Sequence, residues 1–238
     1  MSIAKTNRIL ADGYNLASAL RSFVVSGTAD ELDATHLATG FRVYESGFQS
    51  AEVTAEGFFD SDSVNLDKIH NVFAAALTAR TTQVLTAFLQ DYAFGGDCVM
   101  LNGCITNFAE PIEVNSVILS NAKWRSTNGL QMGKGYISEA ADTETVTSSS
   151  IDNTTATTNG GLVHVHLDNS AATDVDVTIE HSTDNSTWVT LATISNLSGA
   201  YSSGSATVAI GTTIRRYTRA IATVDDAVDL ITVAFARN

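Results

Sequence analysis

Alternation of polar and apolar residues predicts strands in the first part of the chain. In residues 49–59, which read Q-S-A-E-V-T-A-E-G-F-F, Glu52, Thr54 and Glu56 alternate with alanine and valine. A period of two places successive side chains on opposite faces of a strand, so one face is polar and the other apolar. The other strands that the pattern predicts lie at 19–27, 82–90, 98–106, 112–124 and 130–138.

Between the first two predicted strands, residues 28–47 show no clear periodicity. This pattern predicts a loop of about twenty residues, and loops of that length are usually functional or mobile. We favour a contact role for this loop over simple mobility.

One helix is expected after the polar run at residues 60–63, because apolar residues recur there at helical spacing. Either Asp62 or Ser63 is a suitable N-cap. The residues of the apolar stripe are Leu66, Ile69, Phe73 and Leu77.

The second part of the chain reads as a separate β-domain. Residues 139–161 contain few large apolar side chains and form the expected junction, although Thr145–Asp152 could pair as a polar edge strand. Beyond them, short apolar runs alternate with turn residues, as in an antiparallel β-sandwich of jelly-roll or immunoglobulin-like type. The fold class expected is mostly β, with domains at 1–143 and 144–238 and one helix in the first.

Composition limits the function classes. Hydrophobic residues make up 44% of the chain and charged residues 16%, enough for a packed core and too little charge for disorder. The net charge of −13 argues against neutralising nucleic-acid phosphates and against docking on anionic lipid. No stretch has the apolar length of a signal peptide or a membrane span, so we expect a soluble protein made in a cytoplasm and no membrane partner.

Candidate metal and redox residues are few. We favour buried thiols over a disulfide for Cys98 and Cys104, and two thiols cannot complete a zinc site. His164 and His166 share one face of a strand, and His181 could join them from a neighbouring strand. A solvated polar face is favoured for these histidines over a metal site.

Two surface features of the second domain have alternative interpretations. A calcium site could use Asp174 and Asp176 with the acidic residues at 225–229, but no loop spacing gathers the oxygens that calcium needs. The segment Ser182–Trp188 resembles a hairpin turn of secreted β-domains. Trp188 is then either a buried anchor, which we favour, or a platform for stacking a sugar.

Catalytic motifs are missing from the sequence. It has no nucleophile elbow, zinc-protease motif, P-loop or dinucleotide fingerprint. Glu52 and Glu56 could in principle form a two-carboxylate site, but no spacing distinguishes them from an ordinary polar strand face. We therefore expect a protein that is not an enzyme and that binds no cofactor or metal.

The order of parts in residues 3–138 resembles the major tail tube proteins of long-tailed bacteriophages. The likeness is carried by the strand Leu20–Ser26, the acidic segment Ala29–Thr35, the strand ending Glu56–Asp60 and the helix from Val64. The second domain is similar to β-modules appended to phage structural proteins. That likeness rests on A-T-T-N-G-G-L-V-H-V-H-L and V-T-I-E-H-S-T-D-N-S-T-W.

This resemblance implies a virion tail protein whose hexameric rings stack into a tube, together with other tail proteins. Strands of six subunits would form an inner barrel, with Glu52 and Glu56 as candidate lining of an acidic lumen through which DNA passes unbound. The second domain would lie outside, with a host-surface glycan as its candidate ligand. The alternative is a secreted carbohydrate-binding or adhesin-like protein. Candidate residues for the contact between rings are Asp30, Glu31, Asp33, Phe41 and Tyr44.

Overall fold

The computed structural model describes residues 8–35, 41–60, 68–89, 92–112 and 116–238. The chain is mostly β, with antiparallel sheets and, in the described residues, one helix, as expected. It forms two compact units. The first contains Met1–Ser18, Gln83–Asn102 and Gln131–Asn238, and the second contains Ala19–Thr82 and Gly103–Leu130. The expected boundary at 143/144 lies inside the first unit, and the separability of residues 144–238 stays a prediction.

The first unit is built from strands alone in the part of it that the structure describes. One series of paired strands runs β14-β11-β16-β8-β6-β5-β1-β2, and a second runs β10-β15-β12-β13, with β9 also on β15. Their bounds are β1 (Ile9–Ala11), β2 (Tyr14–Asn15), β5 (Gln83–Phe88), β6 (Asp97–Ala109), β8 (Gln131–Ala141), β9 (Thr145–Thr147), β10 (Ile151–Asp152), β11 (Gly161–Ser170), β12 (Val175–Ser182), β13 (Val189–Leu197), β14 (Tyr201–Val208), β15 (Tyr217–Val224) and β16 (Val228–Arg237).

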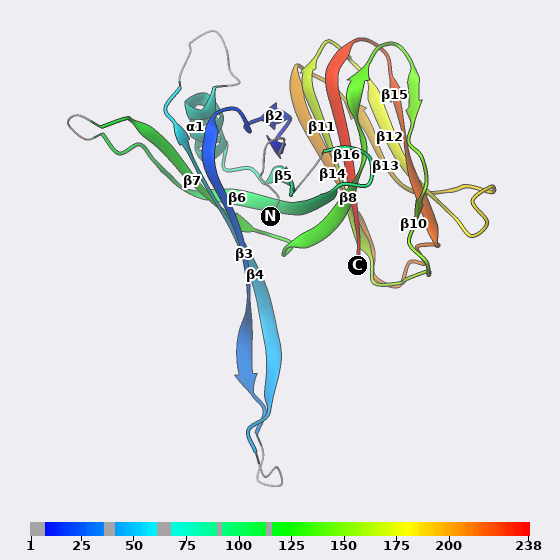
Figure 1. The fold of residues 1–238 in the computed structure, drawn as a ribbon, viewed down its shortest axis with the longest axis horizontal. Helices are drawn as coiled ribbons and strands as arrows, with labels where there is room; N and C mark the ends of the chain where they lie inside the picture. Colours follow the sequence, from blue (N-terminus) through cyan, green and yellow to red (C-terminus); the bar gives the residue numbers. More distant parts are fainter. Residues whose placement is uncertain (1–7, 36–40, 61–67, 90–91, 113–115) are drawn as a thin grey trace. The chain divides into compact units, whose positions relative to one another are not determined.

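A β-sandwich dominates this unit, as predicted for the C-terminal part of the chain. The layer of β14, β11 and β16 faces the layer of β13, β12 and β15 (Figure 1). Val163, Val165 and Leu167 of β11 and Val177 and Ile179 of β12 are buried in the core between them. The expected polar edge strand is also present, since β9 and β10 both pair with β15.

The opposite face of β11 is buried as well, which corrects the expectation of a solvated histidine face. His164 and His166 are at most 1% exposed. The Gly13 amide donates to Nδ1 of His166 at 3.2 Å, and Nε2 of His166 contacts the Thr86 hydroxyl at 2.9 Å. That hydroxyl lies 3.0 Å from Nδ1 of His164. This chain of bonds fits a neutral His166 that donates to Thr86, which in turn donates to His164.

Gly13 is required at this crossing. Its φ is +89°, and an added Cβ would lie 2.5 Å from the Leu167 carbonyl oxygen and from the Ser202 amide nitrogen. A side chain at this position would therefore separate β2 from β11 and break the amide bond to His166.

The other candidate metal ligands do not converge. His181 lies on β12, in the other layer of the sandwich, and accepts a hydrogen bond from the Arg215 amide. Asp225 accepts bonds from the amides of Thr173 and Asp174, so it caps a turn. Among the described residues no group of three or more metal-ligating side chains is found.

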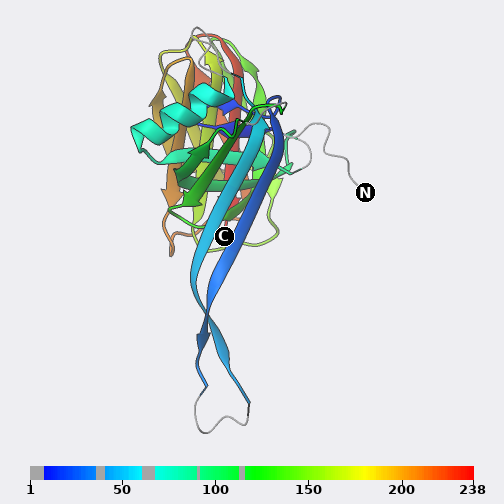
Figure 2. The ribbon, with the colours of Figure 1, turned by 90° about the vertical axis from the view of Figure 1, so that its left-hand side faces the viewer.

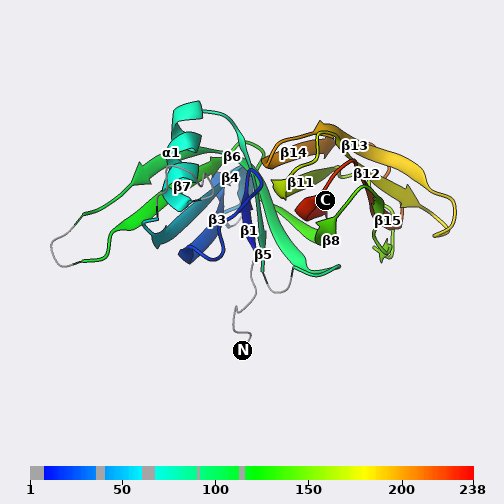
Figure 3. The same ribbon diagram turned by 90° about the horizontal axis from the view of Figure 1, so that it is seen from above.

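The second unit is a sheet with a helix on one face. Its strands pair in the order β3-β4-β7-β6, with the second half of β6. The bounds are β3 (Leu20–Asp33), β4 (Tyr44–Phe58), β7 (Leu119–Ser126) and α1 (Ile69–Ala79). Figure 3 shows α1 over β7, where the ring of Phe73 meets Trp124 edge-on, with centroids 5.2 Å apart.

The helix begins later than the sequence predicts. Its N-cap is Lys68, without a side-chain cap bond, whereas Asp62, Ser63 and Leu66 lie outside the described residues. Ile69 and Phe73 are buried as expected, but Leu77 is 40% exposed. The buried stripe of the helix therefore runs from Ile69 to Ala76 and does not include Leu77.

The predicted long loop at 28–47 is wrong. Residues 28–33 and 44–47, half of it, continue β3 and β4, which pair through Leu32 with Glu45 and Asp33 with Tyr44. The polar and small residues hid the strands, because neither face of this part of the hairpin is buried in the chain and alternation therefore has no physical cause there. A register shift between Ala29 and Glu31 further interrupts the period.

Other local expectations agree with the structure. Both cysteines are free thiols, but only Cys98 is buried and Cys104 is half-buried; burial raises the pKa of Cys98 to about 12. The turn after β12 forms as predicted: the Asp184 carboxylate accepts bonds from the amides of Ser186 and Thr187, and Asn185 has a φ of 58°.

The buried histidines make a pH-dependent prediction. Burial lowers the pKa of His166 to about 3, and burial and then the neighbouring His166 lower that of His164 well below its ordinary value. Below about pH 6.5 the unfolded chain binds protons that the folded chain does not, so stability is complete above that pH and falls as the pH approaches 3. We expect His166 alone to remove about 2 kcal/mol of unfolding free energy between about pH 6.5 and 4.5, and His164 to add to this loss.

Urea unfolding at these two pH values measures the effect. The matched variant is His164→Gln with His166→Gln, which removes both titrating groups and should show a smaller pH dependence. An equal pH dependence in the double variant and the natural chain would contradict the assignment.

Candidate functional site: the open face of the second unit

The face of the β3-β4-β7 sheet opposite α1 is polar and exposed or half-buried, and we call it the open face. Along β4, Ala51, Val53 and Ala55 are buried, whereas the residues between them point the other way. This confirms the two-faced strand that alternation predicts. The open face comprises Ser22, Val24, Ser26, Thr28, Ser50, Glu52, Thr54, Glu56, Asn121, Lys123 and Arg125, with Arg21 at a register shift beside Ser22.

Glu52 and Glu56, the candidate lining residues, each pair with a cation from a neighbouring strand. Oε1 of Glu56 lies 2.5 Å from Nε of Arg21 on β3. The Glu52 carboxylate lies 2.6 Å from Nζ of Lys123 and 3.8 Å from Nε of Arg125, and both cations are on β7. The strand that seemed acidic in the sequence therefore belongs to a face that carries three cations as well as two carboxylates.

This pairing also bears on the two-carboxylate hypothesis. Glu52 and Glu56 are four residues apart on one strand, roughly 13 Å along its axis. Each carboxylate is turned to its own cation, and the pair does not converge on a common point. The geometry offers no acid and base flanking one reacting bond.

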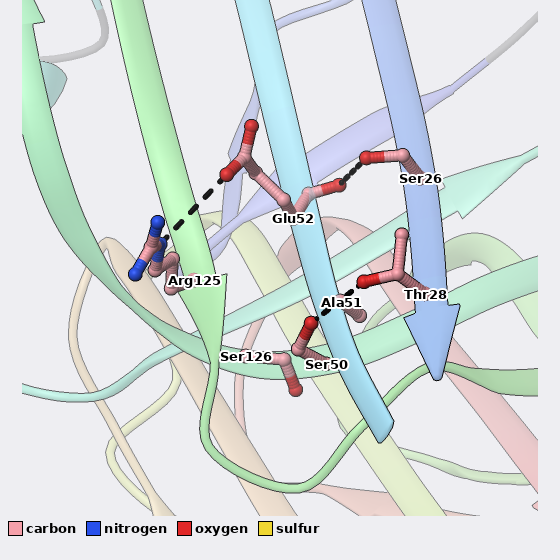
Figure 4. Close-up of a pocket in the computed structure, with 7 residues that line it drawn as sticks. All are labelled: Ser26, Thr28, Ser50, Ala51, Glu52, Arg125 and Ser126. Carbon is pink, nitrogen blue, oxygen red and sulfur yellow. Dashed lines mark hydrogen bonds and ion pairs between the residues drawn. The ribbon is translucent and has the colours of Figure 1, made fainter. Parts of the chain in front are cut away.

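A cavity of about 360 Å³ lies at the end of the open face (Figure 4). Hydroxyl groups dominate its lining, and the Thr28 and Ser50 hydroxyls are 2.8 Å apart. Arg125 enters from β7, and its side chain is 71% exposed. We call this cavity the Arg125 pocket; its lining residues are Ser26, Thr28, Ser50, Ala51, Glu52, Arg125 and Ser126.

Beyond this pocket β3 and β4 continue as a two-stranded ribbon, because β7 pairs with β4 only from Glu52 to Phe58. We call the described residues 27–35 and 41–51 the arm (Figure 2). Three large apolar side chains are exposed on it: Leu32 is 54% exposed, Phe41 76% and Tyr44 48%. In the described part of the unit no third strand pairs with the arm, and an isolated two-stranded hairpin is only marginally stable in water.

The arm is acidic. It carries four carboxylates and one cation, Arg42, whose guanidinium donates to the Tyr44 hydroxyl at 3.2 Å. Hydrogen bonds from the hydroxyl and amide of Thr35 lower the pKa of Asp33. The four carboxylates belong to Asp30, Glu31, Asp33 and Glu45.

All five residues nominated for a contact between rings lie on the arm, and their role stays a prediction. The sequence reading missed Leu32 and Glu45, although a lone leucine inside an acidic segment was a usable signal. It also missed Arg125 and Lys123, because cross-strand neighbours can be identified only once the register is known.

In the first unit, Trp188 is neither a fully buried anchor nor a free platform. Its side chain is half-buried, and the Arg219 guanidinium lies 4.2 Å from the ring centroid. Arg219 is itself held by Glu180 at 2.7 Å. One face of the indole is thereby covered, which leaves less aromatic surface for a sugar.

No protein-family model and no curated protein matches the sequence. Among solved structures, a chain of the native gene transfer agent virion matches with 18% identity over 56% of this chain and 98% of its own, at a TM-score of 0.45. A subunit of the SPP1 tail tube matches with 8% identity over 56% of this chain and 80% of its own, also at 0.45.

A match along the whole chain is found with the SPP1 Dit protein of the phage hub adsorption apparatus. It has 9% identity, covers 98% of this chain and 99% of its own, and gives a TM-score of 0.40. The chain is similar to tail proteins of bacteriophages and gene transfer agents.

Proposed function

We propose that this chain is a structural protein of a virion tail, which assembles from copies of itself into stacked rings that form a tube. One observation carries the proposal: the arm leaves its sheet with exposed apolar side chains and without a third strand. Such a ribbon is a liability in a monomer and an advantage in an assembly, where a neighbouring copy covers it.

Backbone edges support the same proposal. Among the described residues β3 pairs only with β4, so its other edge has no neighbouring strand along its fourteen residues. Between the two register shifts, residues 22–29 of β3 carry no proline and no charged side chain, the residues that protect the edge strands of many monomers. We propose that this edge pairs with a neighbouring subunit, so that the open faces together form an inner barrel. Six subunits per ring is the number that the family resemblance implies.

The open face, with Glu52 and Glu56, is the proposed lining of the tube. Its carboxylates are paired with cations, so these two residues supply less negative potential than β4 alone would. The net charge of −13 and the acidic arm would still disfavour retention of DNA phosphates. DNA would pass along a polar surface on which Arg21 and Lys123 are already paired with carboxylates.

The sandwich strands of residues 144–238 are proposed to lie on the outside of the tube, where a host-surface glycan is a candidate ligand. These strands are joined to β8 by backbone hydrogen bonds, since β16 pairs with β8 from Val228 to Ala236. Other tail proteins are the expected further partners, and the tail of the virion is the expected location. The proposal includes neither catalysis nor a cofactor. In the described residues no helix is long and apolar enough to cross a bilayer.

The first prediction is that the purified chain forms rings or tubes. Exposed apolar residues and an open strand edge favour association as the concentration rises. Negative-stain electron microscopy across a concentration series is the measurement. A monodisperse monomer at every concentration, especially one that binds glycans, would replace this proposal by the secreted carbohydrate-binding alternative.

The second prediction concerns the apolar side chains of the arm. We expect a triple variant with Leu32→Ser, Phe41→Ser and Tyr44→Ser to lose tube assembly while its melting temperature stays close to that of the natural chain. The three side chains are largely exposed, so the folded subunit gains little from them. Sedimentation velocity would measure assembly, and thermal unfolding of the dispersed protein would measure stability.

The matched control makes the same change on three exposed residues of the first unit. Met132, Val189 and Ile210 are 57%, 43% and 86% exposed. Their replacement by serine should leave assembly intact. Equal losses in the two triple variants would show a general effect of surface hydrophobicity and would count against the arm.

A further inference from the structure

A second cavity, of about 250 Å³, lies in the first unit over neighbouring residues of β6, β8 and β16, and we call it the Arg237 pocket. Lys134 of β8 pairs with Asp97 of β6 on one side and with Phe235 of β16 on the other. Asn153, which follows β10, borders the pocket from the other layer of the sandwich. Pockets for drug-sized ligands measure roughly 300–1,000 Å³, so this one suits a smaller ligand, of the size of one sugar ring.

Part of the lining of the Arg237 pocket is apolar. Tyr136 and Phe235 are buried, and their ring centroids lie 6.2 Å apart. The Tyr136 hydroxyl is engaged with the Thr218 hydroxyl at 2.6 Å, so Tyr136 offers its ring to the pocket and not a free hydroxyl. Met132 also lines the pocket and is largely exposed. These side chains provide apolar surface for the C–H groups of a ligand.

Arg237 is a half-buried cation without a counter-ion. Asp97 neutralises Lys134 at 2.7 Å, whereas Arg237 forms no ion pair within the described part of the chain. Its Nη atoms donate to the carbonyls of Asn153 and Thr155, and its buried Nε has no hydrogen-bond partner there. Burial lowers the pKa of Arg237, because a guanidinium removed from water is costly to keep charged. An anion at this position would offset that cost.

The remaining polar groups of the pocket can accept hydrogen bonds from a ligand. The Asn153 amide donates to the Arg216 carbonyl and to the Thr218 hydroxyl, which leaves its own oxygen as an acceptor. Asp97 has a largely exposed carboxylate with two oxygens, and one of them meets Lys134. The lining as a whole carries one net positive charge, in a chain whose net charge is −13. A ligand with one carboxylate and several hydroxyl groups matches this set.

Resting on the proposed glycan ligand of the exterior strands, we propose that the Arg237 pocket binds a sugar ring that carries a carboxylate, such as a uronic acid unit of a surface glycan. The carboxylate serves as the counter-ion of Arg237, in a charge-assisted hydrogen bond. Hydroxyl groups of the ring donate to Asp97 and Asn153, and its C–H groups pack on Met132. A neutral sugar would leave Arg237 without a counter-ion and would therefore bind more weakly.

A comparison of ligands tests the role of the carboxylate. NMR titration of the full chain with galacturonate and with galactose compares two sugars that differ in that group. We expect galacturonate to bind about tenfold more tightly or better. Equal affinities for the two sugars would overturn the pairing with Arg237. A short oligogalacturonate should bind at least as tightly as the single sugar, and its failure to bind would overturn the assignment to a glycan.

Substitutions at the pocket test its location. Met132→Glu supplies a carboxylate that competes for Arg237, and we expect it to weaken galacturonate binding about tenfold or more, whereas Met132→Gln, of similar size, should retain binding. Because Met132 is largely exposed, neither change should affect folding. Arg237→Met should lose binding. Its control is Arg215→Met, which changes another half-buried arginine of the first unit outside the pocket lining.

Circular dichroism verifies that each variant is folded. Unchanged affinity in both Met132→Glu and Arg237→Met would overturn the pocket as the binding site. If the natural chain forms tubes but binds no galacturonate, the pocket proposal is wrong and the proposed assembly stands. A chain that binds galacturonate through this pocket but stays monomeric at every concentration would overturn the assembly and leave the pocket proposal standing.

Discussion

A β-strand in a sheet needs partners for the hydrogen-bonding groups on both of its edges, and β4 has two neighbours for only half of its length. From Glu52 to Phe58 it lies between β3 and β7, but from Tyr44 to Ala51 it has β3 alone. The outer backbone groups of such a ribbon hydrogen-bond to water. No buried core offsets the conformational entropy that is lost when the ribbon is ordered. The proposed assembly follows from this deficit, because a second copy is the simplest source of the missing contacts.

Sequence reasoning predicted the parts of the fold whose pattern reflects burial. Alternation along β4 located the buried alanines and Val53 because α1 covers that face. Residues 28–33 and 44–47 of the arm escaped prediction for the same reason: neither face of the ribbon is buried there, so the sequence shows no period. The histidines of β11 were misassigned because alternation cannot distinguish a polar residue facing water from one facing a second layer, here with Thr86 as its partner.

The sequence predicted the acidic residues of the candidate site but not its basic residues. Glu52 and Glu56 stand out in a single strand, whereas Arg21, Lys123 and Arg125 become relevant only when β3 and β7 are placed on either side of it. The register of β3 and β7 against β4 therefore turns an apparently acidic strand into a face of mixed charge.

The central claim, that the arm gains its partner only on assembly, can be measured by hydrogen exchange. Amides of residues 27–33 and 44–51 should exchange rapidly in dilute, dispersed protein and become strongly protected in the assembled state, while β4 from Glu52 to Phe58 is protected in both. Equal exchange of the arm in the two states, either fast or slow, would contradict the account.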